Sequence, residues 1–80
     1  MAQFYFDYRH DNGQLDADEA GIEMPSIEAA YLAAYYAAID MWAEARHNGR
    51  DLSRHSFEIR WAHQGVLLEL PFAEVLGVRA

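Results

Sequence analysis

The stretch from Ser26 to Gly49 constrains the fold most, because it reads as one long helix with apolar residues on too many sides. Between Ile27 and Ala45 the charged residues are Glu28, Asp40 and Glu44 alone. A helix on the surface of a small domain normally has one apolar stripe and one polar face. This segment carries two apolar stripes on nearly opposite sides. We expect one stripe to pack on the chain's own core, so the other stripe must be covered by another segment or another chain.

The predicted helix spans residues 26–48, and its ends carry the expected signals. Ser26 is a good N-cap, because its hydroxyl can accept a hydrogen bond from a first-turn N–H. Gly49 is a natural C-terminal stop. The stripe facing the core has spacings of three and four: Ile27, Ala30, Tyr31, Ala34, Ala38, Met41, Trp42 and Ala45.

The second stripe is the strongest functional signal in the sequence. On an ideal helix four of its residues fall within about 60° of one another and roughly 180° from the core stripe. With the neighbouring tyrosine, the predicted interface comprises Leu32, Tyr35, Tyr36, Ile39 and Ala43. We expect two identical chains to meet there, since two-fold homodimers dominate among soluble oligomers. Two alternatives stay open: the C-terminal segment of the same chain covers this stripe, or a different protein binds it.

Two predicted strand hairpins flank the helix. Residues 3–9 alternate between aromatic and polar side chains, Asp11-Asn12-Gly13 is a tight-turn signal, and residues 14–16 return as a short edge strand. Residues 16–25 are expected to form a connection with Ile22 and Met24 turned inward. The second hairpin takes residues 56–62 and 66–70, with a turn at 63–65, and residues 72–78 form a short closing turn.

The order strand, strand, helix, strand, strand predicts an α+β fold, written ββαββ. Its expected form is a small antiparallel four-stranded sheet with one long helix packed on one face. Eighty residues make a single domain, residues 1–80, built from a hairpin (3–16), a helix (26–48), a hairpin (56–70) and a C-terminal turn (72–78).

Several segments resemble a family of short uncharacterised bacterial proteins that carry a single domain of unknown function and are frequent in alphaproteobacteria. The resemblance rests on the aromatic first strand, the Asp-Asn-Gly turn, the stretch from Asp18 to Pro25, residues 27–30 and the Leu70-Pro71-Phe72 strand end. It implies the same fold and a bacterial origin, and it brings no activity or catalytic residue. The chain departs from the family on its outer helix face, where Arg or Glu would be expected instead of Leu32, Tyr35, Tyr36 and Ile39.

Charge and composition exclude several classes of function. Six basic residues, all arginines, stand against thirteen acidic ones, for a net charge of −7. This balance repels phosphate backbones and anionic lipids, so we expect no nucleic-acid partner and no membrane partner. The chain has no cysteine, hence no disulfide or thiolate site. Its first residues do not form a secretory signal. We therefore expect a cytoplasmic protein.

Candidate metal sites are weak in this sequence. Read from Tyr8, the acidic connection places Asn12, Gly13 and Glu19 at positions of a calcium-binding EF-hand loop, but Tyr8 and His10 stand where acids are needed. The four histidines form no metal-binding spacing and are expected on the surface: His10, His47, His55 and His63. We expect no metal and no cofactor.

Candidate catalytic groups are equally weak. The three serines, Ser26, Ser53 and Ser56, lie in no nucleophile motif. Glu58 and Glu69 fall on facing strands, but Arg60 shares their side, so a solvated, charge-balanced sheet face is expected. Tyr5 faces outward without the basic groove that a single-stranded RNA site needs.

The sequence thus predicts a non-enzymatic, acidic protein-interaction module that self-associates through its outer helix face, with a further protein partner as an option. The alternative function is a small-molecule or peptide binder that uses exposed aromatic side chains or a cleft between subunits.

Overall fold

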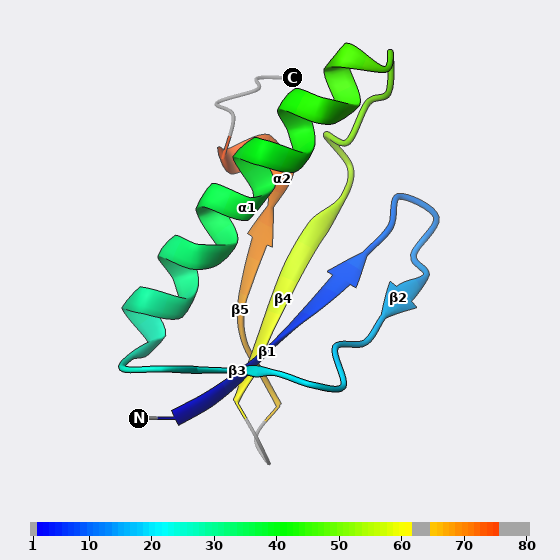
Figure 1. The fold of residues 1–80 in the computed structure, drawn as a ribbon. Coiled ribbons are helices and arrows are strands. Elements are labelled where there is room, and N and C mark those ends of the chain that lie inside the picture. Colours follow the sequence, from blue (N-terminus) through cyan, green and yellow to red (C-terminus); the bar gives the residue numbers. More distant parts are fainter. Residues whose placement is uncertain (1, 62–64, 76–80) are drawn as a thin grey trace.

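The computed structural model describes residues 2–61 and 65–75, and it confirms the predicted α+β class. One antiparallel sheet is covered on one face by a long helix, α1 (Ile27–His47), as Figure 1 shows. The strands are β1 (Ala2–Arg9), β2 (Leu15–Asp16), β3 (Ile22–Met24), β4 (Ser56–Trp61) and β5 (Val66–Pro71). A single helical turn, α2 (Phe72–Val75), follows β5 directly.

The sheet is built around β1, in the order β2-β1-β4-β5. On one side β1 pairs with β4 along its length, from Phe4 opposite Trp61 to Arg9 opposite Ser56. On its other side β1 pairs with β2 at one end and with β3 at the other. The far strand, β5, pairs with β4 and has a register shift beside Ile59 and Arg60.

Strand β3 corrects the prediction that residues 16–25 form a connection without a strand. The three residues pair with the start of β1, with Ile22 opposite Phe4 and Met24 opposite Ala2. Met24 packs against the core as expected, but Ile22 is 52% exposed, so its predicted burial is wrong. The two side chains lie two residues apart and so share the face of the sheet that α1 covers, but Ile22 lines an open hollow beside Phe6 and Ala37, where that cover is incomplete.

Both predicted helix ends are confirmed. The Ser26 hydroxyl accepts a hydrogen bond from the Ala29 N–H at 3.1 Å. At the other end Gly49 takes a positive φ of 71°, and the next N–H, of Arg50, donates to the Ala45 carbonyl at 2.7 Å. This arrangement satisfies carbonyls of the last turn that have no partner within the helix.

The core lies between α1 and the sheet, and alanines on α1 allow the close approach. Every residue of the predicted core stripe is buried or packs against the buried cluster. Leu52 is buried, and so are Phe72 and Val75 of α2, while residues 76–78 of the predicted closing turn lie outside the described residues. In the part of the chain that the structure describes, the largest fully buried side chains are Phe72, Ile59 and Leu70, which come from α2, β4 and β5. Among the residues described, no helix is both long and apolar enough to cross a membrane.

Candidate functional site

The predicted outer stripe of α1 divides into an exposed part and a covered part. Leu32 is 51% exposed and Tyr36 is 61% exposed, and Ala43 is also exposed. Tyr35 and Ile39 instead are partly buried and pack against the core. The five residues are therefore not equally exposed, since Tyr35 and Ile39 are half-buried, and their place in an interface stays a prediction.

The turn α2 explains part of this division. The Tyr35 hydroxyl donates a hydrogen bond to the Val75 carbonyl at 3.4 Å, so the C-terminal turn lies against this flank of α1. The alternative in which the C-terminal segment covers the stripe thus applies to Tyr35. Leu32, one turn nearer the start of the helix, remains exposed.

Leu32 lies beside the last strand of the sheet. Together with Ile27, Tyr31 and Leu68 it lines an apolar hollow of about 240 Å³, and Glu28 is the charged residue in that lining. Figure 1 shows α1 running along the β5 side of the sheet, which is why a helix residue and an edge-strand residue share this hollow. The exposed apolar surface therefore continues from the helix onto the sheet.

A second hollow adjoins the first through two shared residues, Ile27 and Leu68. Its volume is about 450 Å³, and Phe4, Trp61 and Leu67 complete its lining. Phe4 and Trp61 stack with ring centroids 6.3 Å apart. The apolar edge, as we name this surface, consists of the exposed residues that line these two hollows: Leu32, Trp61, Leu67 and Leu68. Monomeric proteins rarely expose larger contiguous apolar patches than a few hundred Å².

The sequence missed the apolar edge because its members lie far apart in the chain. Strand β5 was expected to return beside β4, and the topology confirms this. The residue pattern of β5 alone does not show that this strand is the last one in the sheet. A signal was present all the same. Val66, Leu67 and Leu68 are three consecutive apolar residues in a strand, and such a run leaves at least one of them without cover when only one face is packed.

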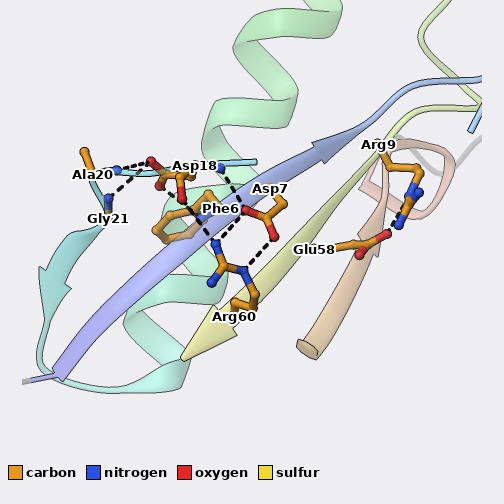
Figure 2. A network of polar contacts seen from close by, with 8 residues as sticks. All are labelled: Phe6, Asp7, Arg9, Asp18, Ala20, Gly21, Glu58 and Arg60. Carbon is orange, nitrogen blue, oxygen red and sulfur yellow. Dashed lines mark hydrogen bonds and ion pairs between the residues drawn. The ribbon is translucent and has the colours of Figure 1, made fainter. Parts of the chain in front are cut away.

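The opposite face of the sheet carries a buried polar network, where a solvated face was expected. Asp7 is only 2% exposed, although it lies on the side of β1 away from α1. As Figure 2 shows, Arg60 from β4 reaches across and donates to both carboxylate oxygens of Asp7, at 2.8 and 3.2 Å. Arg60 also donates to the Asp18 carbonyl at 3.2 Å and lies over the Tyr5 ring, 4.7 Å from its centroid.

Asp18 closes the gap between β2 and β3 along the edge of β1. One of its carboxylate oxygens accepts the Phe6 N–H at 3.1 Å, and the other accepts the N–H groups of Ala20 and Gly21 (Figure 2). Its own N–H donates to Asp7 at 2.9 Å. The side chain thus replaces a strand partner where neither β2 nor β3 reaches Phe6.

The pKa values of both aspartates follow from these contacts. Burial is the largest single effect on the pKa of Asp7 and raises it, but hydrogen bonds from Arg60 and the Asp18 N–H, with the charges of Arg60 and Arg9, lower it overall. For Asp18 burial again raises the pKa, and the three backbone N–H groups that it accepts outweigh that effect. Both carboxylates are therefore ionised and engaged in holding the fold.

Glu58 and Glu69, the predicted carboxylate pair, do stand directly opposite each other on β4 and β5. Their environments differ, because Glu58 is buried whereas Glu69 is exposed. Glu58 accepts a hydrogen bond from the Arg9 guanidinium at 2.8 Å (Figure 2). The expected charge balance is present, but the expectation that this face is solvated is wrong for Glu58 and Asp7.

His55 corrects the expectation of four surface histidines. It is buried beside Phe72, and its Nδ1 lies 2.8 Å from the Tyr8 hydroxyl. Nearby, His10 bonds to the Asp16 carboxylate at 2.7 Å. His63 lies outside the described residues. Within the described ranges no three histidine or carboxylate side chains are placed to share a metal ion.

Comparison with known proteins gives a family and no activity. No curated protein matches this chain, and no solved structure matches it either. A family model described as a domain of unknown function, DUF6894, matches residues 3–73, which includes the whole of α1 and, apart from Ala2, every strand of the sheet. The chain therefore belongs to the DUF6894 family, as a single domain of unknown function.

Proposed function

We propose that this protein is a non-catalytic, acidic interaction module that self-associates through the apolar edge and the exposed part of α1. The observation that carries the proposal is the position of Leu32 beside Leu68, which joins the exposed helix surface to β5, the last strand in the sheet order, in one apolar hollow. Covering such a surface removes apolar area from water, at roughly 25 cal/mol per Å² before the costs of association.

The buried polar side chains of the domain have structural roles. Asp7, Asp18, Glu58 and His55 each bond to another group of the fold, as described above. The net charge of −7 argues against nucleic acid and anionic membranes as partners. We place the protein in a bacterial cytoplasm, a proposal that rests on its lack of cysteine and on the resemblance of its motifs to bacterial chains.

One substitution tests this proposal directly. Leu32→Arg puts a charge into the proposed interface, and sedimentation velocity should then report a monomer where the unmodified chain sediments as a dimer. Ala17→Arg is the matched control, since Ala17 is exposed in the loop before Asp18, and it should leave the dimer intact. A Leu32→Arg protein that keeps the unmodified sedimentation coefficient would remove the support for this surface.

A second candidate function is the binding of an apolar ligand or peptide. It is favoured by the hollow of about 450 Å³ between Phe4, Trp61 and Leu67, because ligand sites commonly have volumes of about 300–1,000 Å³ and aromatic linings. Titration with the dye anilinonaphthalene sulfonate tests it. Saturable binding that Leu67→Arg abolishes would favour this candidate, and no binding by the unmodified chain would exclude it for ligands of this class.

A further inference from the structure

The outer side of β5 is the part of the apolar edge where main-chain hydrogen bonds restrict which partner can bind. Strand β5 is last in the sheet order, and within residues 2–61 and 65–75 no strand pairs with its far side. An edge of this kind presents main-chain N–H and C=O groups that another strand can bind. A partner at this edge is therefore expected to be extended.

The direction of these main-chain groups follows from one hydrogen bond. The Phe72 N–H donates to the His55 carbonyl at 3.0 Å, so this pair belongs to the hydrogen-bonded pairs of the β4–β5 ladder. Such pairs alternate with non-hydrogen-bonded ones in antiparallel strands. Leu70 and Leu68 therefore direct their main-chain groups toward β4. Glu69, between them, directs its N–H and C=O toward the free edge.

We propose that a second copy of this chain pairs with β5 in antiparallel fashion, with the two-fold axis at Leu68, so that the two sheets become one. This inference rests on the proposed self-association and specifies how it occurs. An antiparallel pair of identical strands has a two-fold axis by construction, as closed dimers require. The axis makes Leu68 face the partner's Leu68 and places Glu69 opposite the partner's Leu67. Because the Leu68 N–H points toward β4, the Leu67 carbonyl of the same trans peptide points toward the free edge, where it can accept the Glu69 N–H of the other copy.

Charge and hydrogen bonding select Leu68 over neighbouring positions for the axis. An axis at Glu69 would place two carboxylates directly opposite each other, which is unfavourable across a strand pair. An axis at Leu70 would place Glu69 opposite Pro71, which has no N–H to donate. With the axis at Leu68, each Glu69 faces an apolar residue, and its N–H faces the carbonyl of the partner's Leu67.

The area of the apolar edge fits a dimer of this kind. Trp61 is 41% exposed, and the aliphatic side chains of Leu32, Leu67 and Leu68 are each between 37 and 51% exposed. Together with the main chain of β5 they offer on the order of 500 Å² per copy, about the 1,000 Å² in total that a specific interface needs. Leu32 of each copy would pack on Leu68 of both copies, across the axis.

Single cysteines test the geometry, because the natural chain contains none. A residue on the axis faces itself at a Cα separation of about 4.5 Å in a non-hydrogen-bonded pair, a distance that permits a disulfide. Under mild oxidation at low micromolar concentration, Leu68→Cys should be converted almost completely to a covalent dimer. Tyr36→Cys, which is exposed on the outer face of α1, should stay largely monomeric under denaturing electrophoresis.

Each outcome distinguishes the strand pairing from the proposed function as a whole. Efficient cross-linking of Tyr36→Cys but not of Leu68→Cys would overturn the strand pairing and leave self-association through helices. Equal cross-linking of both variants would overturn it too, since random collision then explains the product. No cross-linking by either variant, with a monomeric mass for the unmodified chain, would overturn self-association itself.

A second pair of variants guards against misfolding of the cysteine chain. Glu69→Pro removes the N–H that faces the free edge, and proline is tolerated on edge strands when that N–H points away from the sheet. It should give a folded monomer with unchanged circular dichroism. Glu69→Gln keeps the N–H and should remain dimeric. A folded Glu69→Pro protein that still sediments as a dimer would overturn the proposed pairing.

Discussion

Asp7 and Arg60 stand on neighbouring strands and form a two-point ion pair on the sheet face that α1 does not cover. The guanidinium donates to both oxygens of the carboxylate, at 2.8 and 3.2 Å, and the Asp7 side chain is almost completely buried beneath it. The pair holds β1 to β4 and, through Asp18, holds the connection between β2 and β3 against the sheet. Polar contacts therefore fix one face of the sheet, while apolar packing fixes the other.

Loss of the guanidinium should cost more than loss of both charges. Arg60→Ala leaves the buried Asp7 carboxylate without its main partner, and we expect the free energy of unfolding to fall by about 3 kcal/mol. The double variant Asp7→Asn with Arg60→Ala removes the stranded charge and should recover part of that loss. Urea unfolding of the unmodified chain, the two single variants and the double variant measures the coupling energy between Asp7 and Arg60. Additive losses would contradict a specific pair.

Acid should weaken the fold through the same aspartate. Because the pKa of Asp7 lies below its ordinary value of 3.8 in the folded chain, its contribution is present above that value and is lost as the pH falls through the folded pKa. Asp18 acts in the same direction. Urea unfolding between pH 7 and pH 2 should show a smaller acid loss for Asp7→Asn than for the unmodified chain. Parallel pH curves would contradict this account.

Asp18 should be needed to hold the edge of β1. In Asp18→Ala the Phe6, Ala20 and Gly21 N–H groups lose their acceptor, and leaving partly buried donors unpaired costs about 1–3 kcal/mol. Amide hydrogen exchange should become faster at Phe6 in particular. Glu19→Ala is the matched control, since Glu19 is the exposed acidic neighbour, and it should leave exchange at Phe6 unchanged. Equal protection of Phe6 in both variants would refute this role.

A side chain at Gly21 should lower the stability of the fold, for two separable reasons. Its φ is +71°, and a Cβ there would lie 2.9 Å from Cε2 of Tyr5 and 3.0 Å from the Gln3 side chain. Gly13 has a similar φ of +88° but open space around it. Both alanine variants pay the backbone cost of about 1 kcal/mol, and Gly21→Ala should lose clearly more. Equal melting temperatures for the two variants would show that the close approach to Tyr5 is unimportant.

The sequence predicted the parts of the fold that depend on hydrophobic periodicity and on the capping signals at the helix ends. The alternation in β1 and β4, the Ser26 cap and the alanine-rich stripe are local patterns, and local patterns define these elements. Asp7 illustrates the limit. Alternation places it on the outer face of the sheet, and only the path of residues 17–21 over that face decides that it is buried. No local pattern encodes such a path.

The candidate site shows the same division. The helix pattern correctly marked Leu32 and Tyr36 as exposed apolar residues. It could not separate them from Tyr35 and Ile39, because the cover over Tyr35 comes from α2, forty residues later in the chain. It could not find the link to Leu68 for the same reason, since β5 lies beside α1 only after the sheet has formed.

The molar mass of the unmodified chain in solution tests the central claim, self-association through the apolar edge, most directly. Light scattering coupled to size exclusion, repeated over a wide dilution series, should give about twice the chain mass of 9.2 kDa at micromolar concentrations and a fall toward that mass on dilution. A constant mass of one chain at every concentration, up to the highest that can be loaded, would contradict the claim.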